Sequence, residues 1–140
     1  MNQKSIFLFI LLIPLDKRET QFQDCSDGNF ASAKLIHVAM SPDPLVSQQS
    51  VTFTVSGSLD YDIKDNGLIV AQLDGEGNTN IDRFASPAKS TKAGQPFSMT
   101  TRQHTLPDIP LNYRITVFIV NPTPQHNNTR DIIGCATAKV

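Results

Sequence analysis

The sequence has no tryptophan, only two cysteines, and no marked excess of either charge. A formal net charge of −1 excludes the basic surplus that is usual in nucleic-acid-binding domains. The missing tryptophan argues against an antibody-type immunoglobulin domain, whose core carries one over the inter-sheet bridge. The chain also lacks a nucleophile elbow, a glycine-rich phosphate loop and an H-E-x-x-H helix, and its histidines are scattered. We therefore expect neither an enzyme nor a cofactor or metal site.

Long hydrophobic runs are missing as well. The longest, from Ile6 to Leu15, covers about ten residues, which is roughly half of what a membrane-spanning helix needs. Because Lys4 precedes it, the run predicts a signal peptide over residues 1–18, with a buried strand or a short anchor as the alternative. Cleavage near Leu15 and dibasic processing after Arg18 are both open. We expect a protein that is secreted or that resides in the lumen of the secretory or vacuolar pathway.

The cysteine content agrees with export. Cys25 and Cys135 lie near the two ends of the chain that would remain after signal removal. An even pair in an oxidising compartment favours a disulfide, and two buried free thiols are the alternative. Closing a loop of roughly 110 residues would stabilise the fold by about 4–5 kcal/mol in the chain-entropy model. Asn127 begins an Asn-Asn-Thr sequon and is a candidate glycosylation site.

The clearest local pattern is the alternation over Ser50–Leu59. Val51, Phe53 and Val55 fall on one face of this segment, and threonines and serines fall on the other. A period of two residues with one apolar face predicts a half-buried strand.

Similar but weaker signals recur along the rest of the chain, separated by turns rich in proline, glycine and asparagine. We expect further strands over Lys34–Met40, Leu68–Leu73, Ile81–Phe84, Phe97–Thr105, Tyr113–Val120 and Ile132–Val140. Loops are expected over Ser86–Pro96 and Asn121–Arg130. Short strands at this spacing, with no amphipathic helix, predict an all-β fold, namely an immunoglobulin-like antiparallel β-sandwich of seven or eight strands.

A family likeness is carried by an ordered set of motifs. These are Asp24-Cys25, Ser41-Pro42-Asp43-Pro44, the alternating strand ending in Gly57, Ser86-Pro87 with Lys92-Ala93-Gly94, Leu106-Pro107-Asp108-Ile109-Pro110, and Gly134-Cys135. In this order the chain resembles the MD-2-related lipid-recognition family. That family includes the Niemann–Pick type C2 sterol carriers and the fungal phosphatidylglycerol/phosphatidylinositol transfer proteins. The resemblance runs from about Gln23 to Val140 and implies one lipid-binding domain over residues 23–140.

The resemblance implies a disulfide between Cys25 and Cys135. It also implies an apolar slot between the sheets that holds a sterol or a phospholipid. Two further disulfides that many members carry have no cysteines here, so the loops at the mouth of the slot are expected to be less constrained. We expect a monomeric lipid-binding or lipid-transfer protein that touches membrane surfaces transiently.

The inward faces of the expected strands supply the lining of such a slot. These residues are Val51, Phe53, Val55, Leu68, Val70, Phe97, Met99, Ile115, Val117 and Ile119. Each buried CH₂ of a ligand would contribute about 0.8 kcal/mol. For every one of these residues an ordinary close-packed core is the alternative.

By the same resemblance, Phe84 and Ile109 lie at the mouth. Lys89 and Lys92 could meet anionic headgroups there, or could simply be solvated. The competing hypothesis for the whole chain is a secreted recognition or adhesion module with a solid core and no lipid.

Overall fold

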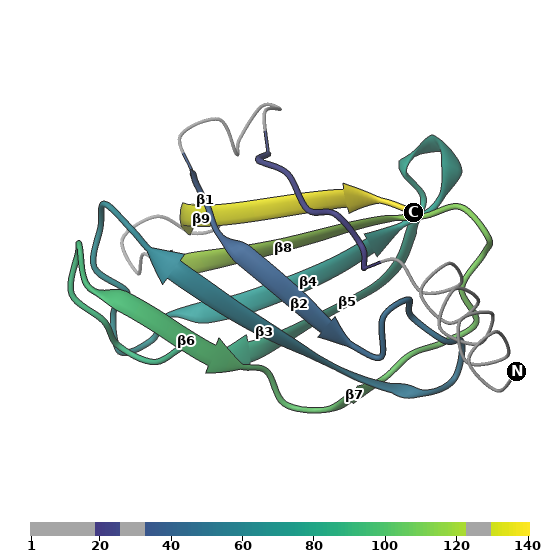
Figure 1. Ribbon diagram of the computed structural model, residues 1–140, viewed down its shortest axis with the longest axis horizontal. Coiled ribbons are helices and arrows are strands. Elements are labelled where there is room, and N and C mark those ends of the chain that lie inside the picture. Colours follow the sequence, from purple (N-terminus) through teal and green to yellow (C-terminus); the bar gives the residue numbers. More distant parts are fainter. Residues whose placement is uncertain (1–18, 26–32, 123–129) are drawn as a thin grey trace, which may run out of the picture.

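The computed structural model describes residues 19–25, 33–122 and 130–140, and it shows two β-sheets packed face to face (Figure 1). The predicted signal peptide and Asn127 lie outside these residues. The strands are β1 (Lys34–Leu35), β2 (His37–Ser41), β3 (Ser50–Ser58), β4 (Leu68–Asp74), β5 (Asn80–Pro87), β6 (Pro96–Thr100), β7 (His104–Thr105), β8 (Arg114–Pro122) and β9 (Arg130–Lys139). A short 3₁₀ turn, η2 (Glu76–Asn78), follows β4. The predicted all-β sandwich is confirmed. Within the described part of the chain, no helix is both long enough and apolar enough to cross a membrane.

One sheet has the strand order β1-β9-β8-β4-β5, and the other has β2-β3-β6 with β7 also paired to β3. All pairs are antiparallel except β1 with β9, which run parallel over two residues and so depart from the expected antiparallel pattern. Seven of the strands described have five residues or more, and β1 and β7 have two each. The expected seven or eight strands therefore correspond to the seven long ones, with two short additions.

The central strand of the smaller sheet follows the alternation of its sequence. Val51, Phe53 and Val55 on β3 are at most 1% exposed, while the threonines between them are half-buried on the other face. In register with Val55 lie Val38 of β2 and Met99 of β6. Apolar side chains from three strands thus meet on the inner face of this sheet.

The segment expected to form one strand over Lys34–Met40 instead passes from one sheet to the other. β1 belongs to the five-stranded sheet and β2 to the smaller one, and Ile36 is the single residue between them. Ile36 is buried directly against Gly134 of β9, where an added Cβ would lie only 2.9 Å from Ile36 Cγ2 and 3.1 Å from Leu59 Cδ2. A glycine is therefore needed at this position for the chain to cross so closely over β9.

Two other expected boundaries differ from the structure. The segment Phe97–Thr105 is interrupted, because Thr101 turns inward to hydrogen-bond Phe53. Its N–H donates to the Phe53 carbonyl at 2.8 Å, and its Oγ1 accepts the Phe53 N–H at 2.9 Å. The strand expected over Ile81–Phe84 extends to Pro87. A proline is tolerated there because β5 is an edge strand that pairs with β4 alone.

The five-stranded sheet is apolar on both faces. Ile69, Ala71 and Leu73 of β4 point into the core between the sheets, whereas Val70 packs on the opposite face. The prediction that Val70, together with Leu68, lines the space between the sheets is therefore wrong. The outer cluster consists of Cys25, Val70, Phe118, Val120 and Cys135, with Ala33, Leu68 and Ile132 packed against it.

The expected disulfide is present in this outer cluster. Cys25 and Cys135 are bonded, with their Cα atoms 5.9 Å apart and a sequence separation of 110. Such a bond is compatible with an extracellular protein or one that passes through the secretory pathway.

Candidate functional site

The two sheets meet differently along their two long edges. On one side, the edge strand β5 faces the segment from β6 to β7, and these elements are not paired with each other. We call this contact, between Asn80–Pro87 and Pro96–Thr105, the seam. The predicted entrance residue Phe84 lies on it, so the seam is the natural candidate for a functional site.

The inward face of β5 alternates polar, aromatic and polar residues. Asp82, Phe84 and Ser86 lie in register with Leu73, Ala71 and Ile69 of β4, all three of which point into the core. Arg83 and Ala85, between them, are exposed on the outer face. An edge strand with polar groups turned inward is a common device against unwanted strand pairing. Here those groups also reach the other sheet.

The strongest contact of the seam joins Asp82 to His104 of β7. Nε2 of the imidazole lies 2.8 Å from Oδ2 of the carboxylate, a distance at which a ring N–H donates to an aspartate. The Phe84 ring stacks on the same imidazole, with centroids 3.9 Å apart and planes 13° from parallel. On its inner side Phe84 meets Phe53, at 5.8 Å between centroids. Phe84 therefore connects the surface of the seam to the centre of the core.

Two more hydrogen bonds cross or flank the seam. Ser86, which is buried, accepts the backbone N–H of Arg102 on its Oγ at 3.1 Å. Near the start of the loop that joins β5 to β6, the Lys89 N–H points at Met99 Sδ at 3.3 Å. Because each of these contacts uses a side chain, the seam has no continuous backbone ladder to hold the sheets together.

The structure brings all but one of the predicted ligand-contact residues to the same inter-sheet cluster. Phe53, Val55, Phe97, Ile115 and Val117 are buried members of it. Phe84, Met99 and Ile109 are only partly buried and pack against its margin. Phe84 and Met99 lie on the seam, while Ile109 lies in the loop beyond β7, where its N–H donates to Ser47 Oγ at 2.9 Å. The exception is Val70, on the far face of the sheet.

The buried members of this cluster pack against one another. Of the two pockets whose linings are described, one reaches this cluster at Ile36, Val38 and Met40, and the other at Tyr113. The first, of about 430 Å³, lies between residues 19–22 and β2, and the other, of about 500 Å³, lies at the end of the five-stranded sheet. Neither of these two pockets lies at the seam.

Of the two lysines expected near the mouth, only Lys89 adjoins the seam. Its side chain is exposed, and its backbone contacts Met99. Lys92 instead forms an exposed ion pair with Asp62 at 3.9 Å, a contact of the kind that contributes little to stability.

The opposite edge of the sandwich is closed by the chain itself, and we call it the closed edge. Here Ile36 links β1 to β2, and the segment 19–25 lies across the gap. Gln23 exchanges two backbone hydrogen bonds of 2.8 Å with Thr137, and two residues later Cys25 forms the disulfide. Farther along, Thr20 donates from its N–H and its hydroxyl to the Asp43 carboxylate, at 2.9 and 2.7 Å.

Asp43 also affects a buried phenol at this end of the molecule. The pKa of Tyr113 is raised above its ordinary value of 10.0, chiefly because burial disfavours the phenolate and secondly because the Asp43 carboxylate repels it. A hydrogen bond with the Leu45 backbone opposes these effects.

The pairing of Asp82 with His104 could not be read from the sequence. Both residues lie in segments predicted as strands, but 22 positions separate them, and periodicity carries no information on which edge strands of opposite sheets will face each other. The one available signal in the sequence was Asp82, which lies two residues before Phe84 and therefore on the same face of the predicted strand.

Comparisons with known proteins do not assign the chain to a family. No family model and no curated protein matches it. Among solved structures, beta-glucuronidase 2 of Bacteroides uniformis, covalently bound to cyclophellitol-6-carboxylate aziridine, matches 84% of this chain at 12% identity and a TM-score of 0.41. The match covers 14% of that protein. At this level of similarity it carries no argument about function.

Proposed function

We propose that the chain is a lipid-binding or lipid-transfer protein of the secretory route that holds a sterol or a phospholipid between its sheets, with the seam as the entrance. One observation carries the proposal. The predicted mouth residue Phe84 lies on an inter-sheet edge that side-chain contacts alone hold together, and it leads directly to the core residue Phe53.

The energies favour opening at this edge. Separating β5 from β7 breaks the Asp82–His104 bond and the Arg102–Ser86 bond, and each such bond contributes about 0.5–1.5 kcal/mol net, somewhat more when a charge is involved. An acyl or sterol body offers about 0.8 kcal/mol for each buried CH₂. A dozen buried carbons would therefore exceed the cost of breaking these two hydrogen bonds, before the loss of the Phe84 ring contacts and the entropy of binding are subtracted.

The polar groups of the seam suit an amphipathic ligand. Asp82, His104 and Ser86 flank the aromatic ring of Phe84, so a polar head could remain among them while the apolar body passes inward. The exposed Lys89 adjoins this site and could contact an anionic membrane surface during transfer.

Native mass spectrometry of the disulfide-bonded protein, purified without detergent and then extracted with organic solvent, tests the proposal. We expect close to one lipid per chain, displaced by added sterol or phospholipid. Phe84→Asp should remove the lipid, because it places a charge at the entrance. Ala85→Asp is the matched control, since Ala85 is the next residue on the same strand and is exposed on its outer face. A protein that stays free of lipid after incubation with a lipid panel contradicts the proposal.

A recognition module with a solid core is the second candidate. It is favoured by the packing of the interior, where Phe53, Val55, Ile115 and Val117 have no exposed surface. It predicts no bound lipid in the same experiment and equal behaviour of Phe84→Asp and Ala85→Asp, provided that both variants fold.

A further inference from the structure

The pocket of about 500 Å³ lies at the end of the five-stranded sheet, where β4 ends, β8 begins and β9 ends. Asp74, Arg114 and Lys139 form a row across these three strands, because Asp74 is in register with Arg114, and Arg114 with Lys139. Their neighbours Leu73 and Ile115 point into the core, so this row points away from the other sheet. The pocket is thus separate from the seam.

Two cations of this row stand side by side without an anion. Arg114 and Lys139 are directly opposite each other on adjacent antiparallel strands, an arrangement in which like charges repel. In the described part of the chain, no ion pair involves either of them. Among the described residues, the Arg114 guanidinium donates from Nη1 to Thr137 Oγ1 over a long 3.4 Å.

The nearby carboxylate of Asp74 forms no ion pair with either of them among the residues described. It is occupied by amides, accepting from Gln72 Nε2 at 3.0 and 3.2 Å and from Asn80 Nδ2 at 3.5 Å. Arg114 and Lys139 therefore line the pocket without an ion-pair partner in the described part of the chain, next to a carboxylate whose hydrogen bonds go to amides.

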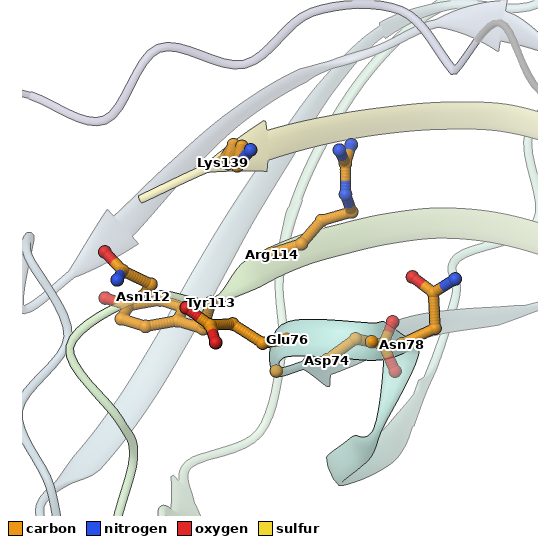
Figure 2. Close-up of a pocket in the computed structure, with 9 residues that line it drawn as sticks. Asp74, Glu76, Asn78, Asn112, Tyr113, Arg114 and Lys139 are labelled. Carbon is orange, nitrogen blue, oxygen red and sulfur yellow. The ribbon is translucent and has the colours of Figure 1, made fainter.

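The facing wall carries a charge of the opposite sign. It is the turn after β4, and it presents Glu76 and Asn78; Figure 2 shows these two residues on the far side of the pocket from Arg114 and Lys139, with Asn112 and Tyr113 at one end. Glu76 is exposed, and its carboxylate takes part in no ion pair among the residues described. Charges of opposite sign thus face each other across the pocket without touching.

We propose that this pocket binds a phosphorylated amine. Among the described residues, neither cation of the pocket has an ion-pair partner, and Glu76 is the lining carboxylate that no amide side chain is shown to bind. A phosphate monoester, with a charge of about −1.5 to −2 at neutral pH, matches the Arg114–Lys139 pair, and its oxygens suit the guanidinium fork. An ammonium group a few atoms away matches Glu76. The proposal does not depend on the lipid-binding function, because the pocket shares no residue with the seam.

Isothermal titration with three small probes tests this inference, using phosphoethanolamine, inorganic phosphate and ethanolamine. We expect phosphoethanolamine to bind at least about tenfold more tightly than either of the others, because only it engages both walls. Amide shifts in NMR spectra should be confined to Asp74–Asn78, Asn112–Arg114 and the end of β9. Equal affinity for phosphate and phosphoethanolamine, or shifts elsewhere, would overturn the proposal.

Variants test the contribution of each wall of the pocket to binding separately. Arg114→Gln or Lys139→Gln should weaken phosphoethanolamine and phosphate alike, whereas Glu76→Gln should lower phosphoethanolamine to the level of phosphate and leave phosphate unchanged. Lys64→Gln and Asp65→Asn are matched controls, since both residues are exposed and neither lines the pocket. If Glu76→Gln has no effect on phosphoethanolamine, the assignment of the ammonium is wrong.

The same chemistry could come from a soluble metabolite or from a lipid headgroup, and a diester probe distinguishes them. Equal binding of glycerophosphoethanolamine, together with capture of phosphatidylethanolamine vesicles, supports a headgroup. If phosphoethanolamine binds and glycerophosphoethanolamine does not, the result supports a soluble ligand. Failure to bind either one overturns the proposal, and neither result bears on lipid carriage through the seam.

Discussion

The two long edges of the sandwich use different means to hold the same pair of sheets. At the closed edge, the chain passes from sheet to sheet at Ile36, backbone hydrogen bonds join Gln23 to Thr137, and a disulfide joins Cys25 to Cys135. At the seam, Asp82 and Ser86 reach across with side-chain contacts.

This difference makes the seam the edge with fewer links between the sheets, and the proposed function uses it as the entrance. At the closed edge the continuous chain at Ile36 joins the two sheets, while Gln23 and Cys25 bind the segment 19–25 to β9. At the seam only side-chain contacts cross, and a few such bonds can break and re-form within the native state. An apolar ligand that enters between the sheets would therefore come through the seam. The predictions below weaken one edge at a time.

Removing the disulfide should have the largest effect. Cys25→Ser with Cys135→Ser should lower the free energy of unfolding by about 4–5 kcal/mol, because the unfolded chain regains the entropy of a long loop. Urea unfolding with and without a reductant measures this, and reduction of the unmodified protein should give the same loss. A loss below about 1 kcal/mol would show that backbone pairing alone maintains the closed edge.

Breaking the seam should cost much less. His104→Ala removes both the contact with Asp82 and the stacking on Phe84, and we expect a loss of about 1–2 kcal/mol. Hydrogen exchange should accelerate in β5 and β7 and stay unchanged in β8 and β9. Gln103→Ala, at the neighbouring exposed position, is the control. Uniform acceleration across both sheets would contradict the idea of a locally opening edge.

Alkaline pH should loosen the anchorage of the segment 19–25 by a small amount. The pKa of Tyr113 is raised in the folded protein, so below about pH 10 both states keep the proton and stability is unaffected. As the pH rises further, the unfolded state loses its proton first, and stability falls until the pH passes the pKa of the folded state. The phenolate would also repel Asp43, which binds Thr20.

Urea midpoints measured between about pH 9 and 11 test this linkage. Tyr113→Phe should flatten the decline, whereas Tyr61→Phe should not, because Tyr61 is 64% exposed. If the urea midpoint falls equally with pH in Tyr113→Phe and in the unmodified protein, groups other than Tyr113 cause the loss of stability.

The sequence predicted the buried residues of a strand correctly where the other face of that strand is exposed to solvent. Ser50–Ser58 alternates because its outer face meets solvent, so its buried residues were assigned correctly. Leu68–Leu73 has no such contrast, since an apolar cluster covers its outer face too, and the phase of Val70 was therefore misassigned.

The candidate site was only partly predictable for a related reason. Phe84, Met99 and Ile109 were identified as apolar positions and do lie at the margin of the core. The contact of His104 with Asp82 depends on how the edges of two sheets face each other, which local patterns do not specify. The passage of the chain between the sheets at Ile36 was also not predictable from local patterns. It depends on contact with Gly134, which is far away in the sequence.

The bond between Cys25 and Cys135 has a mechanical consequence as well. Tension applied to the chain outside the two cysteines passes through the sulfur atoms and bypasses the whole segment between them, which a sequence separation of 110 defines. Strands β1 to β8 and the first half of β9 would bear no load, and only the short flanking segments could be drawn out. The domain would therefore transmit a pulling force as a short, inextensible link for as long as this one bond stays oxidised.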